Sequence, residues 1–298
     1  MGLDFATLKK ENLIIADKFR RAGLEEDYVL LSSCATYVSY KNFADSRALH
    51  LSNFCKSKFC PICNRINAYK QKRKMRDFLK KYDFAAHEHY HLIFTLEDCG
   101  LNCIKKTIKI IKSAWAKMIR RVNFKKKILD YSYYVHVKYN AGAREDKAYN
   151  VHLHVICIYN NNIAKSDITC EHEAWENGFY KTFCRKKEKS GYSIDYKPVV
   201  LLNKIETPKH LVNLVGYCAR GIDVVNVPVK DLAELKRQLT NVNLMQSSQH
   251  LGKLLRDQER KKKKIVRLPY YISVTIWSDK RYEDAYAYDP ITYNTIVD

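Results

Sequence analysis

The sequence predicts an α+β fold in which antiparallel strands are accompanied by amphipathic helices. Residues 89–98, 131–140 and 149–159 alternate apolar side chains with period two, which indicates strands. The polar stretch AGAREDKA between the last two strands is suited to a hairpin turn, and a hairpin joins antiparallel strands. Residues 103–122 place isoleucines and a tryptophan on one stripe at helical spacing, which predicts a helix.

The remaining elements follow from local signals along the chain. Thr207 and Pro208 predict a helix start, because Thr caps the first turn and Pro lacks an N–H that this turn does not need. Gly221 predicts the end of that helix. Helices are also expected at residues 4–30, 64–81 and 229–240 and within the polar stretch 160–190, and strands at 192–200 and in the C-terminal LPYYISVTIW.

The chain is strongly basic, with a formal net charge of +21 over 298 residues. Residues 101–127 hold ten Lys and Arg and no acidic residue, residues 56–81 hold ten against Asp77 alone, and RKKKK follows at 260–264. With 22 tyrosines, this pattern favours a phosphate-rich partner, nucleic acid above an anionic membrane surface. No apolar run is long enough for a transmembrane helix, and the N-terminus lacks a signal core, so a cytoplasmic protein is expected.

Four cysteines have the spacing of a zinc site. Cys34, Cys55, Cys60 and Cys63 form the pattern C-x20-C-x4-C-x2-C, in which the last pair can reach one tetrahedral ion from a tight turn. His50 could replace one ligand, and buried thiols or a redox pair are the alternatives. The other cysteines are expected to be small apolar residues: Cys99, Cys103, Cys157, Cys170, Cys184 and Cys218.

Two histidines share one face of the strand YNVHLHVICIY. His152 and His154 are two residues apart, and a hairpin centred near residues 143–145 places His136 opposite His152. Three imidazoles could then converge on a divalent cation beside a basic groove and polarise a phosphate. Satisfied core or surface histidines are the alternative. The other histidine run, HEHYH at 87–91, is assigned to the surface or to a strand edge.

Several motifs carry a family resemblance, which covers roughly residues 10–255. HLHV resembles the HUH motif of rolling-circle endonucleases, and CKSKFCPICNRINAYK resembles the cysteine-rich segment of rolling-circle plasmid replication initiators. LIFTLED lies where that family has its first strand motif, and YYVHVKYN lies where it has a metal-ligating glutamate, here His136. LVNLVGYCARGID resembles the family's tyrosine motif, and all these motifs occur in the family's order.

The resemblance implies a fold and a division of the chain. The implied fold is the antiparallel-sheet core of HUH endonucleases, which is ferredoxin- or RRM-like, with flanking helices and an inserted N-terminal zinc-binding segment. Residues 1–82 would hold the first helix, the cysteine segment and the basic helix. Residues 83–225 would form the endonuclease core with its tyrosine helix, and residues 226–298 would add helices and a strand that pack on this core.

The resemblance also implies a reaction, which is sequence-specific nicking and strand transfer at a double-strand origin. Tyr217, on the polar face of its helix, would form a 5′-phosphotyrosyl intermediate, and Arg220 stands where the motif has lysine. Mn²⁺ or Mg²⁺ would be held by His136, His152 and His154, and Zn²⁺ by the four cysteines; the change of glutamate to His136 favours softer ions such as Mn²⁺. The implied partners are DNA, host helicase and DNA polymerase, with a second copy of the chain as a further candidate and no membrane partner.

Asn213 departs from the pattern of relatives that place a water-activating glutamate four residues before the tyrosine. Termination would then need Glu206, a second tyrosine or a second protomer. Three alternatives stay open. They are a relaxase or single-strand DNA transposase of the same superfamily, a non-enzymatic zinc-dependent DNA-binding regulator with structural histidines, and an RNA-binding protein.

Overall fold

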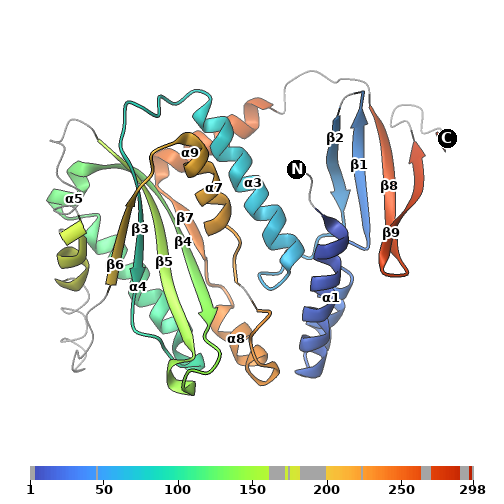
Figure 1. Cartoon of the computed structure of the whole chain (residues 1–298), viewed down its shortest axis with the longest axis horizontal. Helices are drawn as coiled ribbons and strands as arrows, with labels where there is room; N and C mark the ends of the chain where they lie inside the picture. The colour runs from blue at the N-terminus through green and yellow to red at the C-terminus, as the bar shows by residue number, and fades with distance from the viewer. Residues whose placement is uncertain are drawn as a thin grey trace. The chain divides into compact units, whose positions relative to one another are not determined.

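The computed structural model divides the chain into two compact units, which are described separately (Figure 1). One unit comprises residues 1–66 and 262–298, and the other comprises residues 67–261, so that the expected boundaries at residues 82 and 225 do not coincide with this division. The structure describes residues 4–44, 46–160, 172–173, 175–181, 199–222, 224–262, 270–288 and 295–296.

The first unit combines two helices with an antiparallel sheet in the order β10-β9-β8-β1-β2. Its first helix begins where Asp4 accepts a hydrogen bond from the Thr7 backbone N–H at 3.1 Å. The single helix expected over 4–30 is two helices, because Gly23 has a φ of +73° and interrupts it. The elements are α1 (Phe5–Arg21), α2 (Glu25–Ser32), β1 (Tyr37–Phe43), β2 (Ser46–Ser52), β8 (Tyr271–Ser278), β9 (Arg281–Tyr288) and β10 (Thr295–Ile296).

Two features of this unit differ from the expectations. The β1–β2 hairpin lies inside the cysteine-rich segment, where no strand was predicted. The C-terminal strand β8 was expected to pack on the core at residues 83–225, but it pairs antiparallel with β1, with Tyr37 opposite Ile276. More than two hundred residues separate these partners, and local sequence patterns carry no information on a pairing of this range.

The second unit contains the histidine-bearing sheet, in the antiparallel order β6-β3-β5-β4-β7. The strands predicted at 89–98, 131–140 and 149–159 are present, as are the helices predicted at 64–81, 103–122 and 229–240 and from Pro208, and the α+β class with antiparallel pairing is confirmed. Of the strand predicted at 192–200, residues 192–198 lie outside the described residues, and residues 199–200 begin β6. The strands are β3 (His89–Thr95), β4 (Ile128–Tyr139), β5 (Tyr149–Tyr159), β6 (Val199–Lys204) and β7 (Met245–Ser247). The helices are α3 (Pro61–Leu79), which crosses the unit boundary, α4 (Ile104–Met118), α5 (Val122–Lys127), α7 (Pro208–Cys218), α8 (Leu232–Leu239) and α9 (Gln249–Lys262). Of the stretch 160–190, residues 172–173 and 175–181 are described and helical.

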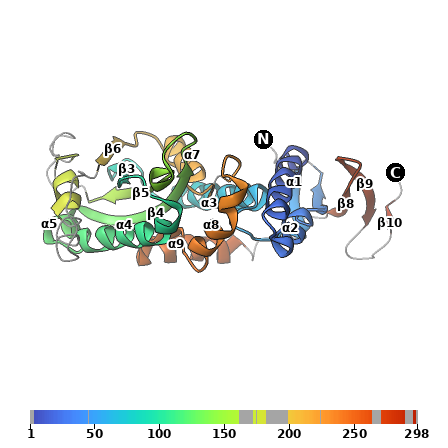
Figure 2. The same cartoon turned by 90° about the horizontal axis from the view of Figure 1, so that it is seen from below.

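Helices cover both faces of this sheet, and Figure 2 shows α4 and α7 on opposite sides of it. On the α4 side, Trp115 packs on Phe94 of β3 with ring centroids 5.7 Å apart. On the other side, Ile156 and Ile158 of β5 belong to one buried cluster with residues of α3, α7 and α9. Because side chains alternate along a strand, His152 and His154 lie on this second face, under α7. Among the described residues, no helix is long and apolar enough to cross a membrane.

Candidate active site

Three histidines meet on the α7 side of the sheet. In the β4–β5 hairpin, His136 is directly opposite His152, which confirms the predicted register. The ring of His154 lies 4.4 Å from that of His136 and 4.8 Å from that of His152, measured between centroids. One nitrogen from each of the three imidazoles lies within 4.8 Å of the others. The sequence pattern therefore placed these three side chains correctly.

Hydrogen bonds to two of the rings determine which nitrogen of each faces the cluster. His136 Nε2 donates to the Cys218 carbonyl oxygen at 2.7 Å, which leaves Nδ1 with a free lone pair. His152 Nδ1 lies 2.7 Å from Asn150 Oδ1 and donates to it, which leaves Nε2 free. The Asn150 amide is itself oriented, because its Nδ2 donates to Asp98 Oδ1 at 2.6 Å. Asp98 and Asn150 are supporting residues that no local sequence pattern indicated.

His91 is a fourth member of the site and corrects a prediction. The 87–91 run was assigned to the surface or a strand edge, but β3 lies between β5 and β6, and both His89 and His91 are buried. His91 Nε2 lies 2.9 Å from His154 Nδ1, and the two rings are stacked 13° from parallel. When His154 donates from Nδ1 to His91, its Nε2 keeps a lone pair. That Nε2 is buried and has no hydrogen-bond partner in the structure.

Burial makes the cluster electrically neutral near pH 7. Desolvation, followed by the nearby His136, lowers the pKa of His152 to about 4 and the pKa of His154 to about 2. Desolvation also lowers the pKa of His91 to about 4 and lowers the pKa of His136. Neutral imidazoles are the form that binds metal ions, so no proton has to leave before a cation can enter.

The donor set fits a divalent cation. The lone pairs of three neutral imidazoles converge, each ring is held by a second hydrogen bond, and the buried His154 Nε2 has no partner without an ion. An all-nitrogen set suits Mn²⁺ or the later transition ions better than Mg²⁺, which prefers oxygen ligands. A second group of three potential ligands, His91, His154 and Cys218, overlaps the first through His154.

Tyr217 lies against the histidines and is open to solvent. Its ring centroid is 5.8 Å from that of His136 and 5.8 Å from that of His154, and the residue is 49 % exposed. Arg220, one turn further on, places its guanidinium carbon 5.8 Å from the Tyr217 ring centroid. The predicted nucleophile, its neighbouring cation and the predicted metal ligands are thus brought together. Asn213 accepts a hydrogen bond from Lys72 at 3.0 Å, and Glu206 lies exposed before α7.

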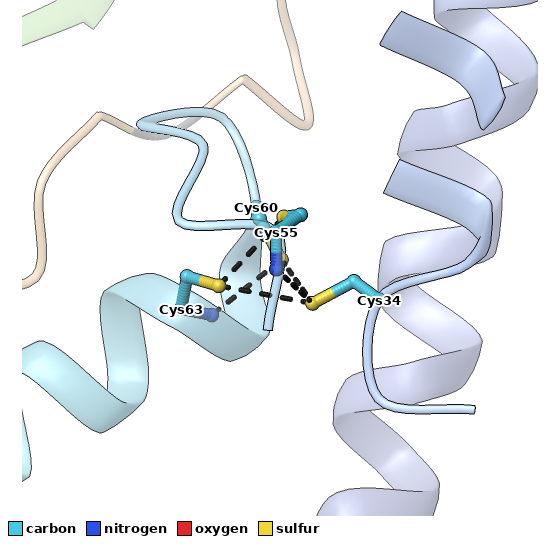
Figure 3. A group of neighbouring side chains, drawn as sticks. All are labelled: Cys34, Cys55, Cys60 and Cys63. Carbon is cyan, nitrogen blue, oxygen red and sulfur yellow. Dashed lines mark hydrogen bonds between the residues drawn. The ribbon is translucent and has the colours of Figure 1, made fainter. Parts of the chain in front are cut away.

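The four cysteines of the first unit point toward one another (Figure 3). The Cys34–Cys63 and Cys55–Cys63 sulfur distances are 3.7 Å, and the Cys34–Cys60 distance is 3.6 Å. A tetrahedral ion with Zn–S bonds of about 2.3 Å requires edges of about 3.8 Å, so the cluster is close to the size that zinc needs. The four thiols are free and not joined as disulfides, and His50, the alternative ligand, is not part of the group.

The electrostatic surroundings of the cysteine cluster include a buried lysine. Hydrogen bonds to the other sulfurs raise the pKa of Cys34 and Cys60 and lower the pKa of Cys55 and Cys63. Lys9 is 1 % exposed, and its ammonium donates to the carbonyl oxygen of Cys34 at 2.6 Å. Burial lowers the pKa of Lys9, and the neighbouring cysteines oppose this shift. A buried ammonium beside these cysteines would offset part of the negative charge of a metal-bound tetrathiolate.

The cysteines outside this cluster differ in their exposure to solvent. Cys157 and Cys218 are buried, as predicted for small apolar residues, whereas Cys103 is exposed. Cys170 and Cys184 lie outside the described residues, and so does part of the basic run 260–264.

Replacing His91 by phenylalanine is expected to weaken Mn²⁺ binding by about 10- to 100-fold, the usual cost of losing a hydrogen bond to a metal ligand. Phenylalanine fills the buried space but cannot hold His154 Nδ1, so the His154 ring loses its orientation. Isothermal titration of the purified protein with Mn²⁺ measures the effect. His89, equally buried on the same strand but stacked on Phe84 at 4.1 Å, gives the matched control His89→Phe. Equal losses in both variants would show that the effect is general disturbance of β3.

Comparison with known proteins places the chain in a family. The model of a family described as "Replication protein" matches residues 46–268, well over half of the chain. A protein named "Protein rep" from Staphylococcus aureus is 26 % identical over 166 residues, which are 52 % of this chain and 69 % of that protein. A "Protein rep" from Streptococcus pneumoniae serotype 2 (strain D39 / NCTC 7466) is 24 % identical over 204 residues, which are 65 % of this chain and 59 % of that protein.

The match to the second relative therefore spans less than two thirds of that protein's length. No solved structure matches the chain significantly, and the assignment to the HUH fold stays a prediction. The family match and both relatives agree with the resemblance carried by the cysteine, histidine and tyrosine motifs. The chain belongs to the replication-protein family, and the predicted membership of the plasmid replication initiators is confirmed.

Proposed function

We propose that this protein initiates rolling-circle replication of a plasmid by nicking one DNA strand at the double-strand origin. The observation that supports this most directly is the position of Tyr217. It is a half-exposed tyrosine that lies against the partly buried His136 and the buried His154, which form a converging group of lone pairs with the partly buried His152. A nucleophile open to a DNA strand and a cation-binding group beside it are the two components that such a reaction needs.

In the proposed reaction, Tyr217 Oη attacks the scissile phosphorus and forms a P–O bond while the bond from phosphorus to the 3′ oxygen breaks. The phenolic proton passes, directly or through water, to the leaving oxygen. The products are a 5′-phosphotyrosyl ester and a free 3′-OH, which a host polymerase can extend. The reverse reaction with another 3′-OH rejoins the strand, so that the enzyme transfers DNA without degrading it.

The surrounding residues would assist through charge and orientation. Arg220 lies beside the Tyr217 ring and can contact the phosphate. His136, His152 and His154 would hold a divalent ion, for which Mn²⁺ is a better fit than Mg²⁺ because no carboxylate is in the group. Such an ion, when bound, supplies charge stabilisation to the phosphate oxygens. In the first unit the four cysteines would hold a structural Zn²⁺.

Among the alternatives, the regulator with purely structural histidines finds least support. Purely structural histidines have no need to bring their lone pairs together, whereas one nitrogen from each of His136, His152 and His154 lies within 4.8 Å of the others. A relaxase or single-strand transposase would use the same chemistry on a different substrate. The match to the replication-protein family favours the initiator.

Covalent capture tests the proposal. The protein is incubated with Mn²⁺ and a supercoiled plasmid that carries the DNA flanking its own gene, quenched with SDS, and digested. We expect mass spectrometry to find a nucleotide attached to Tyr217, and gels to show nicked circles. Tyr217→Phe should give neither product, because phenylalanine keeps the ring and lacks the attacking oxygen.

A matched control is Tyr69→Phe, which removes the hydroxyl of another exposed tyrosine, on α3. This variant should retain both products. An adduct on a different residue would contradict the role of Tyr217. Tight DNA binding without any adduct, with or without metal, would favour the regulator instead.

A further inference from the structure

The side chain of Lys72, on α3, passes over Gly216 of α7, the helix that carries Tyr217. A Cβ atom built on Gly216 would lie 2.2 Å from Lys72 Cδ and 2.4 Å from Lys72 Cγ, far closer than atoms can approach. Glycine at position 216 therefore leaves the space through which the lysine stem passes. This space is found at the residue directly before the proposed nucleophile.

The neighbouring packing holds the two helices together at this point. Ala68, Met75 and Phe78 of α3 share a buried cluster with Leu211, Val215 and Cys218 of α7. Asn67 of α3 also donates to the carbonyl oxygen of Ala219 at 3.3 Å. Residues of α3 before and after Lys72 therefore contact α7, and these contacts fix the position of the Lys72 backbone relative to α7.

The ammonium of Lys72 ends close to the tyrosine face of α7. Its Nζ donates to Asn213 Oδ1 at 3.0 Å. Asn213 precedes Tyr217 by four residues, so both lie on one side of the helix, and helical side chains lean toward the N-terminus. The Tyr217 side chain therefore leans toward the turn where the Lys72 ammonium lies. Arg220 flanks the tyrosine from the opposite direction.

The partner of Lys72 is neutral. Asparagine orients the ammonium but does not cancel its charge, and no carboxylate within the described part of the chain pairs with Lys72. Gly216 and the Asn213 amide hold the Lys72 ammonium in a defined position without neutralising its charge. Such a cation is suited to bind an anionic ligand. In a DNA-nicking enzyme, the anion that would bind next to Tyr217 is a phosphodiester of the DNA strand.

We propose that Lys72 binds a phosphate of the DNA strand at Tyr217, opposite Arg220, and that Gly216 and Asn213 position it. The proposal rests on the proposed function, since it assigns the strand a place beside Tyr217. It also gives Asn213 a role. With its amide oxygen engaged by Lys72, Asn213 holds a phosphate-binding cation and does not activate water.

Two measurements test the proposal. The first is the salt dependence of binding to a fluorescein-labelled single-stranded oligo(dT), for wild type, Lys72→Met and Lys70→Met. Methionine keeps most of the stem and removes the charge, and Lys70 is an exposed lysine on the opposite side of α3. The logarithm of the binding constant falls linearly with the logarithm of the salt concentration. Loss of one phosphate contact in Lys72→Met should make this slope less negative by about 0.7.

The second measurement is the rate of Tyr217 adduct formation at saturating DNA. We expect Lys72→Met to lower it by about 10- to 100-fold, somewhat less than the loss of a buried oxyanion donor, and Lys72→Arg to recover part of the rate. Gly216→Ala should resemble Lys72→Met, because the new methyl group displaces the stem. Circular dichroism melting of each variant confirms that it is folded, and adding Lys72→Ala to Gly216→Ala should relieve any loss of stability.

The two measurements together distinguish a specific phosphate contact of Lys72 from a general effect of basic charge on α3. Equal effects of Lys72→Met and Lys70→Met on both slope and rate would overturn the proposal and make Lys72 one basic residue among many. An unchanged slope and rate in Lys72→Met would overturn it as well. If wild type forms no adduct but Lys72→Met alone makes the slope less negative, the proposed function fails while the phosphate contact of Lys72 stands.

Discussion

Replacing His154 by alanine is expected to lower the rate of DNA nicking by about 10³-fold while DNA affinity stays within about twofold of wild type. His154 is the central ring of the cluster, since His136, His152 and His91 all lie against it. Its buried Nε2 has no other partner, so the substitution removes one of the three proposed ligands. Charge stabilisation by a metal ion contributes several kcal/mol to phosphoryl chemistry, and about 4 kcal/mol corresponds to this factor.

The binding of Mn²⁺ separates this explanation from simple damage to the fold. Titration calorimetry should show that His154→Ala no longer binds Mn²⁺ measurably at concentrations that saturate wild type. The matched control is His210→Ala, which removes an exposed histidine from α7 outside the cluster. Nicking by His154→Ala at the wild-type rate in the presence of Mn²⁺, or its restoration by Mg²⁺ alone, would contradict the assignment of the histidines.

The features of the site that local sequence patterns could predict are those formed within one hairpin or one helix. The alternation of YNVHLHVICIY placed His152 and His154 on one face, and the length of the turn set His136 opposite His152. The start of α7 at Thr207 and Pro208 placed Tyr217 on the polar side of that helix. In each case a short stretch of chain determines the geometry, because strand and helix periods are fixed by backbone stereochemistry.

The features that could not be predicted depend on contacts between distant segments. His91 meets His154 because β3 pairs with β5, and nothing within HEHYH specifies that pairing. Lys72 and Gly216 are 144 residues apart in sequence and meet only when α3 packs on α7. Asp98 supports His152 through Asn150 from the end of another strand. Partners of this kind are selected by the packing of the whole sheet, which periodicity in one segment does not encode.

If the cysteine cluster holds the proposed zinc ion, loss of that ion is expected to unfold the first unit. A structural zinc contributes about 10–16 kcal/mol, which is comparable to the whole stability of a typical domain. The cysteines also join separate elements: Cys34 follows α2, Cys55 follows the β1–β2 hairpin, and Cys60 and Cys63 lie at the start of α3. Without the ion, these segments lose their common attachment, and the buried Lys9 ammonium loses the negative charge beside it.

Cys60→Ser tests this without disturbing the histidine cluster. A chelator would be less specific, because it would also remove an ion held by the histidines. Cys60 is fully buried in the group, whereas Cys103 is exposed and outside it, so Cys103→Ser is the matched control. Elemental analysis should find one zinc per chain in wild type and Cys103→Ser and much less in Cys60→Ser. Hydrogen exchange should show lost protection in α1, α2 and β1 but not in β4 or β5, because the histidine sheet has its own core. Wild-type protection in a zinc-free Cys60→Ser protein would mean that the four thiols are only buried apolar groups and that the first unit is stable without an ion.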